Sequence, residues 1–102
     1  MLLAEFSISP LDKGASLSRW VAGSIDLVDR SGLPYRLGPM GTCVEGEWSD
    51  VIALLGACLE RMTEDCDRIS ITLKADWRRG PSGRLDAKVE KIEQVLGRPL
   101  RR

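Results

Sequence analysis

The sequence predicts an α+β fold with four antiparallel strands and three helices. Residues 2–9 and 68–76 alternate apolar and polar side chains, which is the period of a strand with one buried face. Segments within residues 17–28, 51–62 and 85–96 repeat apolar residues every three or four positions, which is the period of a helix. Two short apolar runs lie between the first two of these helices. The predicted order is therefore strand, helix, strand, strand, helix, strand and a final helix.

The first strand, at residues 2–9, has an apolar face and a mainly polar face, and Pro10 ends it. The residues on these two faces are Leu2, Ala4, Phe6 and Ile8, and Leu3, Glu5, Ser7 and Ser9. We expect Ser16 or Ser18 to cap the first helix through its side-chain oxygen, and Ser31-Gly32 to end it. The predicted core face of that helix consists of Leu17, Val21, Ile25 and Val28.

Residues 33–37 and 42–45 are predicted to form two short strands around a G-P-M-G connection at residues 38–41. The second helix is expected to begin at Ser49 or Asp50 and to end before the acidic segment at residues 65–67. Its predicted core face consists of Val51, Leu55, Cys58, Leu59 and Met62.

The fourth strand, predicted at residues 68–76, is followed by a loop of turn-forming residues at 77–83. The third helix is expected to end at Gly97 and Pro99. Its apolar stripe consists of Leu85, Val89, Ile92 and Leu96. With no repeats and no linker, residues 1–102 are expected to form a single domain.

Right-handed crossovers join this order into a ferredoxin-like βαββαβ antiparallel sheet, with two helices on one face and an additional C-terminal helix. The apolar residues expected beneath the two helices are Ala4, Phe6, Ile8, Ile69, Ile71 and Leu73. The first and fourth strands are neighbours in this topology, so their remaining side chains form one polar face. That face consists of Glu5, Ser7, Ser9, Ser70, Thr72 and Lys74. It is either solvated, as is ordinary for antiparallel sheets, or covered by a ligand or a second subunit.

The composition argues against several classes of function. Fifteen basic residues balance fifteen acidic ones, whereas a dedicated nucleic-acid-binding protein usually has a basic excess. Three cysteines without histidine cannot supply a four-ligand zinc site from one subunit, and they indicate free thiols in a reducing compartment. Because no nucleophile–base pair is evident, we expect neither an enzyme nor a cofactor. With no signal peptide and no apolar run of about 20 residues, we expect a cytoplasmic protein without a membrane partner.

Two other classes of protein that share this topology lack support in the sequence. An RNA-recognition sheet stacks bases on exposed aromatic side chains, but the matching positions here hold serine, threonine and glutamate. An acylphosphatase-like enzyme would need an arginine-bearing loop after the first strand and an asparagine. The loop is P-L-D-K-G at residues 10–14, and the chain contains no asparagine.

Several motifs resemble the small YkoF-like thiamine-binding protein family. They are E-F-S-I-S-P at residues 5–10, S-L-S-R-W-V-A at 16–22, S-G-L-P-Y-R-L-G-P-M-G-T-C-V-E-G at 31–46 and L-K-A-D-W-R at 73–78. They occur in the family's order over nearly the whole chain, and P-M-G-T-x-x-E-G is the most specific of them. Trp48 and Trp77 depart from the family pattern and bear on the identity of the ligand.

The resemblance implies a ferredoxin-like fold, a homodimer or homotetramer, and non-catalytic binding of thiamine or its hydroxymethylpyrimidine part. The ligand-binding residues that it suggests are Glu5, Ser7, Trp20, Met40, Gly41, Thr42, Glu45, Thr72 and Lys74. No metal-binding and no catalytic residue is expected.

Six of these residues have an alternative, structural role. Ser7 and Thr72 either bind the ligand or are interface hydroxyls, and Met40 either lines a pocket or fills a gap in the core. Glu5 either faces the ligand or pairs with Lys74 on the neighbouring strand. Glu45 either contacts the ligand or anchors the start of the second helix. Trp20 either stacks on the pyrimidine or belongs to the core or an interface. The alternative for the whole protein is a structural or regulatory oligomer whose polar sheet face serves only as an assembly surface.

Overall fold

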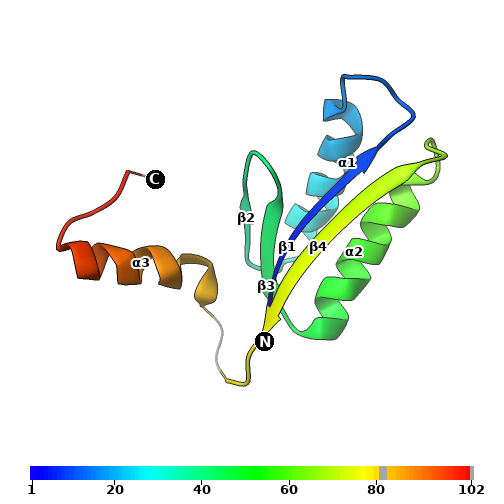
Figure 1. Ribbon diagram of the computed structural model, residues 1–102. Coiled ribbons are helices and arrows are strands. Elements are labelled where there is room, and N and C mark those ends of the chain that lie inside the picture. Colours follow the sequence, from blue (N-terminus) through cyan, green and yellow to red (C-terminus); the bar gives the residue numbers. More distant parts are fainter. Residues whose placement is uncertain (81–82, 102) are drawn as a thin grey trace.

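Figure 1 shows the computed structural model of the chain, which describes residues 1–80 and 83–101. Its elements are β1 (Leu2–Pro10), α1 (Ser18–Arg30), β2 (Tyr35–Leu37), β3 (Thr42–Gly46), α2 (Trp48–Met62), β4 (Ile69–Trp77) and α3 (Arg84–Leu96). The predicted loop at 77–83 is thus shorter, because β4 includes Trp77, and its residues 81 and 82 lie outside the described part.

The four strands form one antiparallel sheet in the order β2-β3-β1-β4. β1 pairs with β4 along its whole length, from Leu2 opposite Trp77 to Pro10 opposite Ile69. The α+β, ferredoxin-like fold expected from the sequence is therefore confirmed. The adjacency of the first and fourth strands is confirmed with it.

α1 and α2 pack side by side on one face of the sheet, over β1 and β3 (Figure 1). The side chains of β1 that point toward them are buried, as the alternation predicted. Together with residues from the two helices, β3 and the segment after α2, they form the core: Leu2, Ala4, Phe6, Ile8, Val28, Val44, Val51, Leu54, Cys58, Met62 and Cys66.

The predicted serine cap of α1 is wrong, and the predicted start of α2 is one or two residues late. The N-cap of α1 is Leu17 and that of α2 is Glu47, and neither side chain makes a capping hydrogen bond. α2 begins at Trp48, just before the predicted Ser49 or Asp50. Tertiary packing of an amphipathic face, rather than a cap, therefore stabilises these helix starts.

The core face of α1 is also rotated from the prediction. Ser24 and Val28 are its buried residues, Trp20 packs against the core, and Val21 is exposed. The small Gly23 and Ser24 face α2, where the Cys58 thiol donates to the Ser24 carbonyl oxygen at 3.7 Å. A Cβ on Gly23 would lie 3.2 Å from Arg61 Nε, so the small residues of α1 leave room for side chains of α2.

The predicted burial of β4 side chains beneath the two helices is also wrong for two residues. Ile71 and Leu73 lie on the helix side of the sheet, but they are 41% and 39% exposed. The two helices cover β1 and β3, so the edge strand beyond β1 is left uncovered. α3 likewise has no buried residue. No helix in the described part of the chain is both long and apolar enough to cross a membrane.

Candidate functional site

A hollow of about 700 Å³ lies between α3 and the sheet face that α1 and α2 leave open. In Figure 1, α3 lies on the other side of the sheet from these two helices. β1, β3 and β4 form the floor of the hollow, and α3 forms a wall. The charged and thiol side chains that line it are Glu5, Cys43, Lys74, Asp76, Arg78, Arg84, Lys88 and Lys91.

The strand register places polar side chains of the open face in a row across the sheet. Cys43 lies opposite Glu5 on one side, and Lys74 lies opposite Glu5 on the other. Ser7 and Thr72 form the next pair along the same face. The Cys43 thiol donates a weak hydrogen bond to Glu5 Oε2 at 3.6 Å. Two residues of the predicted site, Glu5 and Lys74, therefore meet at the hollow, and Ser7 and Thr72 lie beside them.

Glu45 holds α3 against the sheet. Its side chain is only 2% exposed, and its two carboxylate oxygens accept the backbone N–H groups of Gly83 at 2.6 Å and Arg84 at 2.8 Å. These N–H groups begin α3, and a carboxylate is favoured at such a position. The anchoring role considered for Glu45 thus exists, but the helix that it anchors is α3 and not α2.

Arg84, which the sequence reasoning missed, completes this anchor. Its guanidinium donates to the Asp76 carboxylate at 3.1 Å, to the Asp76 carbonyl at 2.9 Å and to the Met1 carbonyl at 3.1 Å. The sequence does contain a signal for this contact. An arginine in the first turn of a helix lies next to the positive end of the helix dipole, which is unfavourable unless an acid lies nearby. Arg36 of β2 also bonds Asp86 of α3.

The hairpin residues lie at a second, smaller hollow of about 170 Å³, to which α1 also contributes. Met40, Gly41 and Thr42 line it, with Met40 90% exposed. A Cβ on Gly41 would approach the Phe6 carbonyl oxygen to 3.1 Å, and a Cβ on Gly38 would lie 2.9 Å from the Gly41 carbonyl oxygen. The two glycines therefore serve the close turn and its approach to β1.

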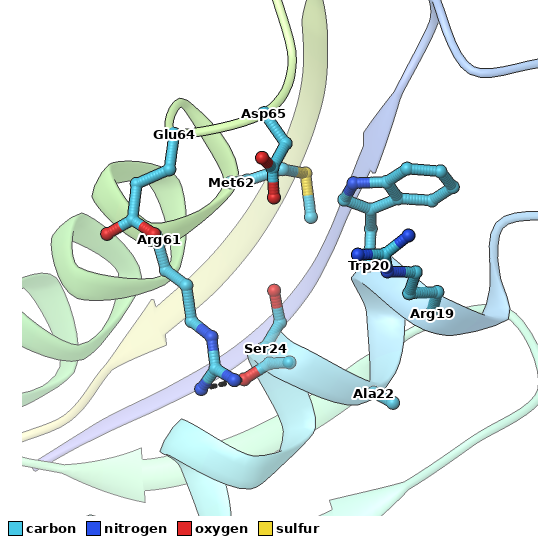
Figure 2. A pocket seen from close by; sticks show the side chains of 9 residues that line it. Arg19, Trp20, Ala22, Ser24, Arg61, Met62, Glu64 and Asp65 are labelled. Atoms are coloured by element: carbon cyan, nitrogen blue, oxygen red, sulfur yellow. Dashed lines mark hydrogen bonds between the residues drawn. The ribbon is translucent and has the colours of Figure 1, made fainter.

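Trp20 lies in a third hollow, of about 420 Å³, between α1 and α2 (Figure 2). Arg61 crosses it and donates to the Gly23 carbonyl oxygen at 3.2 Å. The indole Nε1 of Trp20 is buried without a hydrogen-bond partner in the described part of the chain. This hollow is on the helix side of the sheet, so Trp20 and Glu5 do not share one site within a single chain.

A family model described as "Thiamine-binding protein" matches residues 4–93. The chain belongs to this thiamine-binding protein family. A relative called a UPF0045 protein, from Mycobacterium bovis, is 34% identical over 99 residues, which are 96% of this chain and 97% of the relative. Family membership agrees with the resemblance drawn from the sequence motifs.

Two solved structures share the fold of this family member. A hypothetical protein from Methanocaldococcus jannaschii has a TM-score of 0.82 and 30% identity, over 91% of this chain and 96% of that one. A candidate thiamine biosynthesis/salvage protein from Thermotoga maritima has a TM-score of 0.78 and 21% identity, over 89% and 97% of the two chains. At that lower identity the likeness is one of fold.

The environment of Cys43 makes a prediction about its reactivity. Partial burial, and then the negative charge of Glu5, raise the pKa of the Cys43 thiol above its ordinary value of 9.0. The thiol is therefore mostly protonated at neutral pH, and its alkylation rate should keep rising with pH past about 9 instead of levelling off below it. In a Cys58→Ala/Cys66→Ala background, Glu5→Gln should lower this pKa and speed alkylation severalfold at pH 8. An unchanged pH–rate profile in the Glu5→Gln variant would show that Glu5 does not raise the pKa of the Cys43 thiol.

Proposed function

We propose that the protein binds thiamine, or its hydroxymethylpyrimidine part, in the hollow between the open sheet face and α3, without catalysing a reaction. The observation that carries this proposal is the Glu5 carboxylate. It is exposed on the floor of the hollow, and within the described residues it accepts only the weak Cys43 bond. An aminopyrimidine presents adjacent donor and acceptor atoms, and an available carboxylate can accept from the amino group.

The neighbouring residues support the same location. Lys74 supplies donors next to Glu5, and Ser7 and Thr72 supply hydroxyl groups one step along the face. Membership of a family described as thiamine-binding supports the ligand class. The proposal therefore rests on four residues of the predicted site. Glu5 and Lys74 would bind the ligand, and Ser7 and Thr72 lie next to them.

The proposal includes self-association into a homodimer or homotetramer in the cytoplasm. The uncovered apolar side chains of β4 and α3 support it, because a second copy would remove them from water. They are Ile71, Leu73, Trp77, Ile92, Val95 and Leu96. The same observation favours the second candidate function, a structural or regulatory oligomer that binds no small molecule.

A calorimetric titration with thiamine and with hydroxymethylpyrimidine tests the proposal. We expect saturable binding by the wild-type protein. The affinity of Glu5→Gln should be lower by about tenfold or more, because a charge-assisted hydrogen bond is lost. Glu47→Gln is the matched control, since Glu47 is exposed on the link between β3 and α2 and should bind normally.

Sedimentation of the same samples separates the two candidate functions. A Glu5→Gln variant that keeps the wild-type oligomer and loses the ligand supports the binding protein. No binding by the wild type up to millimolar ligand, with an oligomer that dissociates in Glu5→Gln, would instead establish the open face as an assembly surface.

A further inference from the structure

The hollow carries more positive charge than a cationic ligand such as thiamine would favour. Its cationic side chains are Lys74, Arg78, Arg84, Lys88 and Lys91. The acids are Glu5 and Asp76 on the lining, and Glu45 behind Arg84. Among the residues that the structure describes, five cations against three anions leave a surplus of two positive charges. In a partly enclosed site such a surplus attracts an anion.

The acids are not evenly shared among these cations. Asp76 pairs with Arg84 at 3.1 Å and with Arg78 at 3.4 Å, and Glu45 lies 3.9 Å from Arg84. Lys74, Lys88 and Lys91, in contrast, have no ion pair or hydrogen bond to any side chain in residues 1–80 and 83–101. The positive charge that remains for a ligand is therefore that of the three lysines.

The three lysines approach the hollow from two sides. Lys88 and Lys91 are three positions apart on α3, so they lie on one face of the helix. Ala87, between them and Arg84, is small and leaves room above the sheet. Lys74 rises from the edge strand β4, next to Glu5.

We propose that the ligand of this hollow is a phosphate ester, that is, a phosphorylated form of thiamine or of hydroxymethylpyrimidine. This inference rests on the proposed function, which supplies the ring. Glu5 contacts the aminopyrimidine, and Lys74, Lys88 and Lys91 hold the phosphate. Lysine suits this role because its ammonium group is a compact charge with three donors, which can follow phosphate oxygens without a fixed geometry. The phosphate also offsets the charge conflict between a thiazolium ring and a cationic hollow.

Parallel titrations with the phosphorylated and unphosphorylated forms of both compounds test the inference. We expect the phosphate to tighten binding about tenfold or more at low salt, as charge-assisted hydrogen bonds do. The gain should shrink as the ionic strength rises, because the lysines are at the surface. Comparing thiamine phosphate with hydroxymethylpyrimidine phosphate identifies which ring carries the ester. Inorganic phosphate should compete only weakly with either ester, because it lacks the ring that contacts Glu5.

Single substitutions on α3 assign the phosphate to its lysines. Lys88→Gln and Lys91→Gln should each weaken binding of the esters about tenfold. Binding of unphosphorylated hydroxymethylpyrimidine should stay unchanged, and binding of unphosphorylated thiamine, a cation, should not weaken. Both residues are exposed and pair with no side chain in the described part of the sequence, so the fold should survive. Lys13→Gln, in the segment between β1 and α1, removes the same charge away from the hollow and should change neither affinity.

The outcomes separate this inference from the proposed function. Equal affinity for phosphorylated and unphosphorylated forms, or equal loss of both in Lys88→Gln, would overturn the phosphate site and leave ring binding intact. Lysine-dependent binding of inorganic phosphate, without binding of any pyrimidine compound, would overturn the proposed function and support the anion site.

Discussion

Replacing Glu45 with alanine is expected to release α3 from the sheet while the rest of the protein stays folded. The change removes both acceptors of the Gly83 and Arg84 N–H groups and leaves the Arg84 guanidinium beside an apolar side chain. Each lost charge-assisted hydrogen bond contributes about 1.5–3 kcal/mol. The free energy that keeps α3 docked should therefore fall by about 3 kcal/mol, which is more than a hundredfold increase in opening.

Local opening is the expected result because α3 contributes no buried residue to the core. A released helix of 13 residues is too short to be stable by itself in water. Hydrogen exchange of the α3 amides should accelerate accordingly, with the amides of β1 unchanged. Because α3 forms a wall of the hollow, affinity for the proposed ligand should fall as well.

Glu47→Ala is the matched control for Glu45→Ala, since Glu47 is exposed two positions away and should leave exchange unchanged. Glu45→Gln keeps one carbonyl acceptor, so its exchange rates should lie between those of the wild type and Glu45→Ala. Unaltered α3 protection in Glu45→Ala would show that other contacts, such as the bond between Arg36 and Asp86, hold the helix.

Phe6→Ala is expected to cause the largest loss of global stability, about 3–5 kcal/mol of the free energy of unfolding. Phe6 is buried at the centre of β1 beneath the two helices, so its removal leaves a cavity. The free energy of unfolding of a small domain is only about 5–15 kcal/mol in total. Urea denaturation should therefore show a much lower midpoint with an unchanged slope, if unfolding remains two-state.

Ser7→Ala is the control for Phe6→Ala because Ser7 is the next residue of β1 and points to the open face. Ser7→Ala should change the free energy of unfolding by no more than about 0.5 kcal/mol. A loss as large as that of Phe6→Ala would mean that the open face is also packed in solution, as the assembly alternative requires.

The order of elements was predictable because it depends on local periods in the sequence, and the pairing of β1 with β4 followed from the topology expected for that order. Alternation assigned Phe6 to the core side and Glu5 to the open side, and the register confirms both assignments. The caps of α1 and α2 were not predictable in this way, since serine residues near a helix start do not determine where the packed face begins.

The candidate site was predictable in part. Placing Glu5 beside Lys74 needs only two paired strands, so the topology was sufficient. Lys88 and Lys91 were missed because a lysine on a helix is usually solvated, and no local pattern tells which surface a terminal helix faces.

By itself, the sequence determined the strand and helix order, the two faces of β1 and the family motifs. These properties are local, or follow from the few ways in which such an order can pack. Only the tertiary structure decided that Glu45 binds the start of α3, that Trp20 lies across the sheet from Glu5, and that β4 remains uncovered. Each of these depends on contacts between segments far apart in the chain, which no local period encodes.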